Sequence, residues 1–460
     1  MSDLAAAGSA EVPTADPTFD GWEKLDWRER RARRFARWRS PAGVEFASGG
    51  VRAAFEERVD MVIDAIELRK PARVPVVPAT GAFLGRYAGL TVKEMMYDYD
   101  KLAVAYAKYH DDFIPDFQSD PPSPAPVFDL LGGRFLAWPG HGVPDDQPWQ
   151  YLEAEYMTAA EYDELIADPS AYFMRKLLPR FADAYAGLAS LDPFSDTMEA
   201  SGLPFNILGF ADPAVVESVQ RLHEAANATL EFLGAWMGMA VDVSGRLGIP
   251  LLGSGMVKAP YDIIADTLRG TKGIVMDRYR RPQKILAAAE RFVPLQIDAA
   301  VRQAALAEPP LVWIPLHKGA DGFMSDADFR EFYWPTLKAL VLGMIEQGIV
   351  PMLFAEGGYN ERLEAIADDE VPAGSVIWWF DQTDMAAAKQ ALGGRQCIAG
   401  NVPSALLALG SGDEVAAYVT GLLDEVAGDG GVILTSGAVI DDAKAETVKA
   451  MIDAGRAWRG

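Results

Sequence analysis

Residues capable of acid–base chemistry follow several short apolar runs in the second half of the chain. His317 and Lys318 follow LVWIPL, Glu356 follows VPMLFA, and Asp381 and Gln382 follow SVIWWF. A histidine and carboxylates at such positions can donate or accept a proton, orient one another or bind a metal. We therefore take His317, Glu356 and Asp381 as the catalytic candidates.

Other polar residues near these runs are candidates for substrate binding. A lysine can neutralise a carboxylate or phosphate, and the glycine pair before Tyr359 allows the backbone to approach a ligand closely. The TSG turn can hold an anion through its hydroxyl and backbone N–H groups. The substrate-binding candidates are Lys318, Tyr359, Gln382, Asn401, Ser436, Arg86 and His141.

Each of these positions also has a purely structural interpretation. His317 can be hydrogen-bonded to a neighbouring loop, Glu356 can cap a following helix, and Asn401 can form a turn. Asp384 is predicted to be the N-cap of the helix MAAAKQAL, and Cys397 to be a small core residue.

The elements that must position these residues form a regular pattern. Five apolar runs end in polar residues and glycine, and helix-like stretches separate them. Apolar runs bounded by turn residues are typical of buried parallel strands, and their alternation with helices indicates a parallel sheet or barrel. Such folds carry their chemistry at the carboxyl ends of the strands. Within one run, Trp378 and Trp379 should point to opposite faces. The runs span residues 311–322, 350–360, 375–384, 396–404 and 431–442.

The first half of the chain predicts further elements. RVPVVPA is the first candidate strand, and Arg86 lies in the loop after it. A proline-dense stretch with His141 is predicted to be an irregular insertion, and a glycine-bearing stretch at 251–274 is also read as irregular. An arginine-rich helix at 27–40 should pack its aromatic side on the protein body. Further helices are predicted at about 51–68, 91–113, 159–188, 213–247 and 282–306. We assign residues 1–70 to a disordered tail and N-terminal helical extension, and 71–460 to a barrel domain with an insertion near 116–150.

Composition excludes several classes of protein. The 460 residues carry a formal net charge of −24, which disfavours nucleic acid and anionic membranes as partners. A single cysteine excludes an internal disulfide and multi-cysteine metal sites. No bound metal is predicted; if one binds, His317, Glu356 and Asp381 are the plausible ligands. Without a visible signal peptide or membrane-spanning run, a cytoplasmic location is expected.

From about Val51 the chain resembles the uroporphyrinogen decarboxylase superfamily, which includes the corrinoid-dependent methyltransferases. The residues that carry the resemblance are LHKG at 316–319, CIAGNVP at 397–403 and GGVILTSGAVIDDAKAETVKAMIDA at 430–454. The resemblance implies a distorted (β/α)8 TIM barrel with its pocket at the carboxyl ends of the strands.

The sequence departs from that family at positions that matter for chemistry. The zinc methyltransferases of the family carry His-x-Cys where this chain has His317, Lys318 and Gly319, and a second cysteine where it has Ala438. Both thiolate ligands are missing, so a zinc–sulfur site is not expected. The decarboxylase has an arginine-rich segment after its first strand, of which only Arg86 remains.

The resemblance and the polar strand ends together lead to a methyltransferase-like enzyme. It would move a methyl group from a small methylated compound to a corrinoid carrier or a folate, with His317 protonating the leaving group. The alternative is a decarboxylase or other lyase that needs no cofactor, in which Lys318 or Arg86 anchors a carboxylate. A third reading is a binding subunit without catalysis. No tightly bound cofactor is expected; the corrinoid would belong to a separate carrier protein, and a homodimer is compatible with the sequence.

Overall fold

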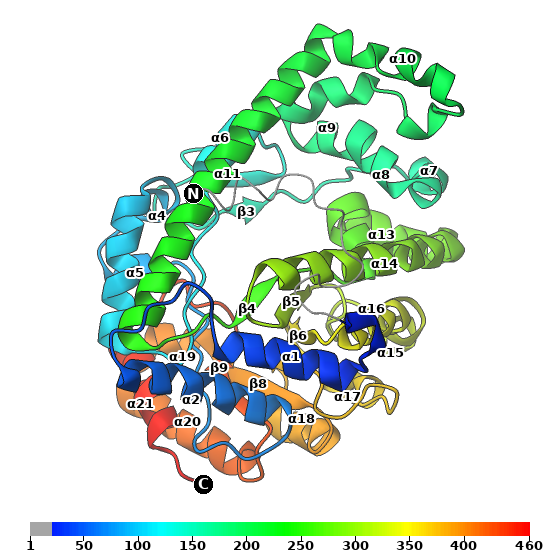
Figure 1. Cartoon of the computed structure of the whole chain (residues 1–460). Coiled ribbons are helices and arrows are strands. Elements are labelled where there is room, and N and C mark those ends of the chain that lie inside the picture. The colour runs from blue at the N-terminus through cyan, green and yellow to red at the C-terminus, as the bar shows by residue number, and fades with distance from the viewer. Residues whose placement is uncertain (1–20) are drawn as a thin grey trace.

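The computed structural model describes residues 21–460, an α/β fold built around a parallel sheet (Figure 1). Six strands lie in chain order, each parallel to the next. The five predicted strands are confirmed, and the segment read as irregular adds a short strand at the edge. The strands are β4 (Gly253–Met256), β5 (Leu311–Leu316), β6 (Val350–Ala355), β7 (Ile377–Phe380), β8 (Cys397–Val402) and β9 (Val432–Ser436).

Two irregular segments, 74–80 and 116–119, lie between β9 and the residues before β4. Prolines in the first segment remove donors, so it forms isolated bridges to the β9 region instead of a regular strand. Backbone N–H groups connect the series, from Val77 to Leu434 at 2.8 Å, from Asp116 to Val76 at 3.1 Å and from Gln118 to Pro250 at 3.0 Å.

Strands β5 to β9 bury both faces, as their apolar composition predicts, whereas the edge strand β4 is largely exposed. One face meets the N-terminal helices α1 (Trp27–Arg39) and α2 (Gly49–Ile66), which contribute Phe35, Trp38 and Phe55. The alternation of side chains along each strand sets this inward row. Its strand members are Leu311, Trp313, Val350, Met352, Phe354, Ile377, Trp379, Cys397, Ala399 and Ile433.

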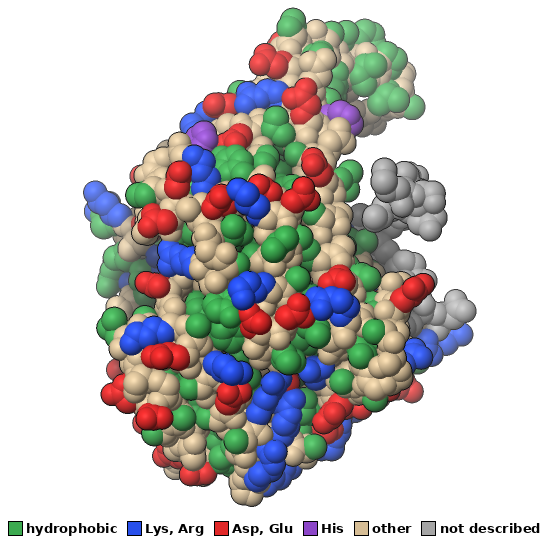
Figure 2. Space-filling model, turned by 90° about the vertical axis from the view of Figure 1, so that its left-hand side faces the viewer, with side chains coloured by type: hydrophobic (Ala, Val, Ile, Leu, Met, Phe, Trp, Pro, Cys, Tyr) green, Lys and Arg blue, Asp and Glu red, His purple; other side chains and the backbone are tan. Residues whose placement is uncertain are grey.

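The arginine-rich segment is a helix that packs on the body of the protein, as expected. Arg30 donates to the carbonyl of Glu346 at 2.7 Å, and Arg34 donates to that of Gln347 at 3.0 Å. These carbonyls end a helix, where a positive charge is favourable. The basic run therefore fixes α1 to the fold. On the face in Figure 2, acidic and basic side chains are interspersed.

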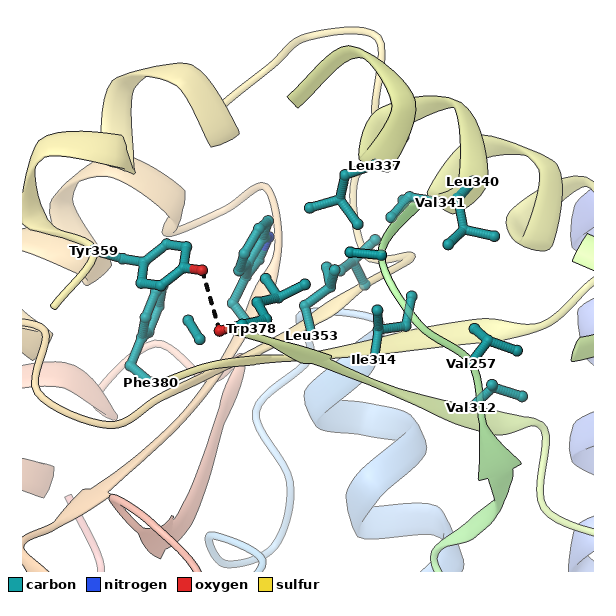
Figure 3. Close-up of a cluster of buried hydrophobic side chains, with 14 of the residues drawn as sticks. Val257, Val312, Ile314, Leu337, Leu340, Val341, Leu353, Tyr359, Trp378 and Phe380 are labelled. Atoms are coloured by element: carbon teal, nitrogen blue, oxygen red, sulfur yellow. Dashed lines mark hydrogen bonds between the residues drawn. The ribbon is translucent and has the colours of Figure 1, made fainter. Parts of the chain in front are cut away.

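The other face of the strands packs against helices. Figure 3 shows this outer core, in which Val312, Ile314 and Leu353 lie beneath Leu337 and Val341. Trp378 belongs here and Trp379 to the inner row, as the alternation predicts. The helices after the strands are α13 (Gly270–Arg280), α14 (Pro282–Leu306), α16 (Trp334–Glu346), α17 (Leu363–Ile366), α18 (Met385–Leu392), α19 (Ser404–Leu409), α20 (Gly412–Val426) and α21 (Ala445–Ala457).

A helical protrusion rises from one end of the sheet (Figure 1). Its axis is α11 (Pro213–Leu247), whose bounds agree with the predicted helix. The protrusion extends beyond the predicted insertion at 116–150, because α11 packs against the short helical turns at 159–211. The predicted helix at 159–188 is broken, with prolines at 169 and 179 beginning new turns. The protrusion also contains the short helices α7 (Tyr162–Ala167), α8 (Pro169–Tyr172), α9 (Leu178–Phe181) and α10 (Leu203–Asn206). Other elements are α3 (Phe83–Tyr87), α4 (Val92–Tyr97), α5 (Tyr99–Phe113), α6 (Ala125–Leu131), β1 (Leu136–Pro139), β2 (Gly142–Val143), β3 (Gln150–Tyr151) and α15 (Asp326–Asp328).

Within residues 21–460, each helix is too short or too polar to cross a lipid bilayer.

Candidate functional site

The helix that follows β4 places two carboxylates beside the end of β5. Asp262 ends α12 (Pro260–Asp262), and Asp266 lies one turn later in the π-helical turn η9 (Ile263–Arg269). Residues four apart share a helix face. Both carboxylates therefore face the backbone and side chain of His317.

His317 is held in one orientation by these neighbours. Its Nδ1 lies 2.6 Å from Oδ2 of Asp266, and its backbone N–H donates to Asp262 at 2.9 Å. The other ring nitrogen, Nε2, lies 3.6 Å from Oε1 of Glu356. The His317 side chain is 34% exposed, so this arrangement leaves Nε2 accessible beside a carboxylate.

The surrounding carboxylates favour the protonated form of the His317 ring. Burial alone would lower the pKa of His317, but the hydrogen bond to Asp266 and the charge of Asp262 outweigh it, so the pKa is raised. Burial raises the pKa of Glu356, although the nearby His317 opposes that shift. A protonated imidazole beside a carboxylate is suited to general acid catalysis.

Two lysines already neutralise Asp266. The ammonium group of Lys258 lies 2.9 Å from Oδ2 of this carboxylate, and that of Lys318 lies 3.4 Å from Oδ1. Lys318 also donates to Thr271 at 2.9 Å. Lys318, a predicted substrate ligand, is therefore engaged within the protein.

Asp262, Asp266 and His317 offer ligand atoms that all lie within 4.8 Å of one another. This donor set does not fit a divalent cation, because two ammonium groups already surround Asp266. Asp262 is also occupied, since Tyr333 donates to it at 2.8 Å.

The position of the missing thiolate is closed as well. A Cβ added at Gly319 would lie 2.6 Å from the hydroxyl oxygen of Tyr359 and 2.9 Å from the ring of Tyr333. Both tyrosines are fully buried. The space that a cysteine side chain would need here is thus filled by aromatic rings.

Tyr359, expected to bind substrate, supports the strand end instead. Its hydroxyl donates to the carbonyl of Leu316 at 3.4 Å, and its ring lies in the outer core (Figure 3). Burial raises the pKa of this hydroxyl far above its ordinary value. The buried ring is therefore not presented to a ligand.

Asp381, Gln382 and Asn401 border a cavity of about 920 Å³ beside β7 and β8. The backbone N–H of Gly357 donates to Asp381 at 3.0 Å, which joins this residue to the loop carrying Glu356. The amide of Asn401 donates to the Thr383 carbonyl at 2.8 Å and accepts from Tyr418 at 3.2 Å. Asn401 thus serves the turn, the structural alternative of the sequence analysis.

The other expected ligands lie apart from His317. Arg86 donates to the carbonyls of Asp441 at 3.0 Å and Asp146 at 2.5 Å, so it braces two loops. The ring of His141 stacks on Trp138 and lies 3.0 Å from Asp129.

Ser436 is fully buried, and its hydroxyl finds no hydrogen-bond partner among the described residues. Two structural expectations are confirmed, because Asp384 caps α18 and Cys397 is a buried core residue.

Asp120 is an acid at the end of irregular segment 116–119 that the sequence analysis did not single out. It follows segment 116–119, and the residue keeps solvent-accessible area although protein atoms surround its carboxyl group. Burial raises the pKa of Asp120 to about 6. The sequence did contain a sign of this residue, since FQSD ends in a carboxylate as the later apolar runs do. The neighbouring prolines, however, led to the prediction of an irregular loop.

An aromatic layer lies below the polar strand ends. Trp313, Phe354 and Trp379 belong to the inward row, and their ring centroids lie 4.1 to 6.2 Å apart. Each precedes a catalytic candidate on the same face of its strand, by four residues for His317 and by two for Glu356 and Asp381. Acid–base groups above an aromatic floor suit a small ligand without large negative charge.

This chain is similar to known proteins both in sequence and in structure. A family model described as uroporphyrinogen decarboxylase (URO-D) matches residues 201–458, more than half of the chain. A methyltransferase from Methanosarcina mazei has a similar structure, with a TM-score of 0.56 at 15% identity, covering 86% of this chain and 97% of that chain. At this identity the likeness concerns the fold alone. No curated protein matches the sequence.

Proposed function

Because this chain belongs to the uroporphyrinogen decarboxylase family, we propose that it is a methyltransferase-like enzyme acting on a small methylated compound. The observation that carries the proposal is the His317 ring, fixed by Asp266 with Nε2 facing Glu356. We also propose that segments 74–80 and 116–119 complete a distorted (β/α)8 barrel around this site.

The protein's own residues handle the leaving group. As the carbon–oxygen or carbon–nitrogen bond to the methyl group breaks, protonated His317 donates its Nε2 proton to the departing atom. Asp266 stabilises the imidazolium until that transfer, and Glu356 orients the ring or the substrate. The acceptor is a second substrate, a corrinoid on a carrier protein or a folate, which supplies the nucleophile that takes the methyl group.

Charge favours a neutral or cationic methyl donor. Lys258 and Lys318 are paired with Asp266, and Arg86 is bonded to carbonyls. Glu356 adds negative charge near His317, and Asp381 adds negative charge near Glu356. A polycarboxylate would meet few available cations here, whereas an alkylated amine or ether would avoid that repulsion.

One observation favours the alternative, a cofactor-independent decarboxylase. Asp120, with its pKa raised to about 6, is an acid that can protonate the carbanion left when carbon dioxide departs. That reaction also requires an anchor for the substrate carboxylate, and the engaged cations of the site offer a weaker one.

The two reactions are separated by their products. Purified protein is incubated with pools of methylated amines and ethers plus reduced cobalamin, and methylcobalamin is followed by absorbance. Parallel pools of isotopically labelled carboxylic acids are assayed for released carbon dioxide. Methyl transfer that falls about 10²- to 10⁴-fold in His317→Gln supports the proposal. Carbon dioxide release without methyl transfer would favour the alternative.

A matched control addresses Glu356. Glu356→Gln should lower turnover, whereas Glu361→Gln, an exposed change five residues later, should not. If both variants were equally active, and His317→Gln were also folded and fully active, the assignment of His317 and Glu356 to the catalytic site would be wrong.

A further inference from the structure

One exposed face of α11 carries the spacing of a helix–helix interface. Apolar or small residues recur at alternating intervals of three and four, the pattern of positions that pair two helices. The residues, which we name the α11 seam, are Val216, Val219, His223, Ala226, Leu230, Leu233 and Met237, all exposed. Leu230 is 60% exposed. The seam covers about 32 Å of helix.

The fold of one chain does not need this face. The opposite side of α11 already packs against the protrusion through Val215, Ser218, Ala225 and Phe232. A helix with one packed face normally exposes polar residues on the other. The seam is therefore apolar for a reason outside the single chain.

A second apolar surface adjoins the N-terminal end of α11. Figure 2 shows hydrophobic side chains gathered at the end of the protrusion. This tip cluster contains Phe194, Met198, Leu203, Phe205, Ile207 and Leu208, each more than half exposed. Seam and tip together expose on the order of 1,000 Å² of apolar surface. That area exceeds the largest patch of a typical monomer and matches one side of a stable interface.

We propose that the α11 seam pairs two copies of this chain in an antiparallel, two-fold arrangement. In this register Val216 faces Leu233 and Val219 faces Leu230 of the second copy. His223 faces Ala226, so the one polar residue of the seam meets its smallest one. The same three layers recur on the other side of the two-fold axis, as an isologous interface requires.

The flanks of the seam suit a second copy. Gln220 and Asn227 border it and come opposite one another across the axis, where their amides can exchange hydrogen bonds. The acidic residues Glu217, Glu224 and Glu231 lie farther round the helix and stay in solvent. Self-pairing thus buries no carboxylate of this row.

The tip cluster also has a complementary surface at the other end of the seam. A cavity of about 310 Å³ lies between α5 and α11, lined in part by Ala103, Ala107, Ala235 and Gly238. In the antiparallel arrangement each tip points toward this end of its partner's α11. Large exposed side chains therefore approach a cavity whose lining combines these small residues with Tyr99, Met239 and the carboxylates of Asp100 and Asp242.

The first test measures the assembly state of the full chain by sedimentation velocity over a range of concentrations. The double variant L230E/L233E should weaken the dimer more than about a hundredfold, because it places carboxylates in the buried layers. Both leucines are exposed in one chain, so the circular dichroism spectrum should be unchanged, whereas Tm should fall only by the amount that dimer formation contributes. The control L306E/L409E makes the same changes at two other exposed leucines and should remain dimeric.

A cross-link test reports the register. Within one helix, residues 219 and 230 are about 16 Å apart, too far for a disulfide. Oxidation of V219C/L230C should therefore give covalent dimers, whereas V219C alone should not. Cys397 is buried and does not interfere.

A wild-type chain that stays monomeric at all concentrations would overturn the proposal and assign this face to another protein. A dimer insensitive to L230E/L233E, or one cross-linked by V219C alone, would also overturn it.

Discussion

At the scale of single residues, the candidate site depends on how His317 is paired. The sequence places it at a strand end, but its protonation follows from Asp266, which binds Nδ1 at 2.6 Å. The same carboxylate also holds Lys258 and Lys318. Asp266 thus raises the pKa of His317 and also pairs with the two lysines that could otherwise bind a substrate anion.

The pairing of His317 predicts a pH effect. Its pKa is raised by Asp266, so the acid form persists above the usual histidine range, and the rate should fall as pH rises through the raised pKa. Asp266→Asn removes that charge, so the basic limb of the kcat profile should move to lower pH. A limb that stays in place while the variant remains folded would mean that His317 is not the acid.

The contact around Gly319 predicts a packing effect. Gly319→Ala should destabilise the protein by about 1–3 kcal/mol, because its Cβ would press on the buried Tyr359 and Tyr333. Urea unfolding measures this change. Gly322→Ala is the control, since a Cβ there meets nothing within 4 Å. Equal stability of both variants would show that the tyrosines can move aside.

At the scale of elements, a buried ion pair holds the two irregular segments together. Arg73 bonds to both oxygens of Asp116, at 2.6 and 2.5 Å, and the Val76 N–H donates to the same carboxylate at 2.8 Å. Neither segment forms a full strand ladder. The carboxylate therefore supplies the link that regular hydrogen bonding would otherwise provide.

Removal of that carboxylate predicts a large loss of stability. Asp116→Ala should lower the free energy of unfolding by about 3–5 kcal/mol, because the largely buried guanidinium groups of Arg73 and Arg58 would lose their shared carboxylate partner. Asp112→Ala, on an exposed carboxylate paired with Lys108, should change it little. Chemical denaturation compares the two variants, and similar losses would contradict the assignment.

The Asp116 carboxylate also makes the free energy of unfolding depend on pH. Burial alone would raise the pKa of Asp116, but the Arg73 hydrogen bonds outweigh it and lower the pKa. Its contribution is therefore complete above the unfolded-state pKa of about 4 and is lost as pH falls through the folded-state value. The difference in free energy of unfolding between wild type and Asp116→Ala should therefore stay constant near neutral pH and decrease only as pH falls below about 4.

At the scale of the whole molecule, net charge opposes the proposed pairing. Each chain carries −24, so two copies repel one another while the seam and tip attract. Salt screens repulsion between exposed charges but hardly affects buried apolar contacts. The dimer Kd should therefore fall as sodium chloride rises from low to moderate concentration, measured by sedimentation. A Kd that rises with salt would indicate an interface held by opposite charges.

The predicted strands rest on local signals that tertiary contacts did not override. Apolar runs closed by glycine and polar residues marked β5 to β9, and the helices at 213–247 and 282–306 were predicted to their terminal residues. The short strand β4 was not predicted, because two of its four residues are glycines. Segment 116–119 was predicted to be irregular, because prolines follow it closely.

The sequence by itself determined which residues lie at strand ends, because the period of two along each strand places His317, Glu356 and Asp381 on the inward side. Only the tertiary structure decided what those residues meet. Asp262 and Asp266 lie 55 and 51 positions before His317, a separation at which no sequence period operates. The burial of Tyr359 and the pairing of the lysines likewise arise from packing between distant segments. They therefore could not be predicted from the sequence and were found only in the tertiary structure.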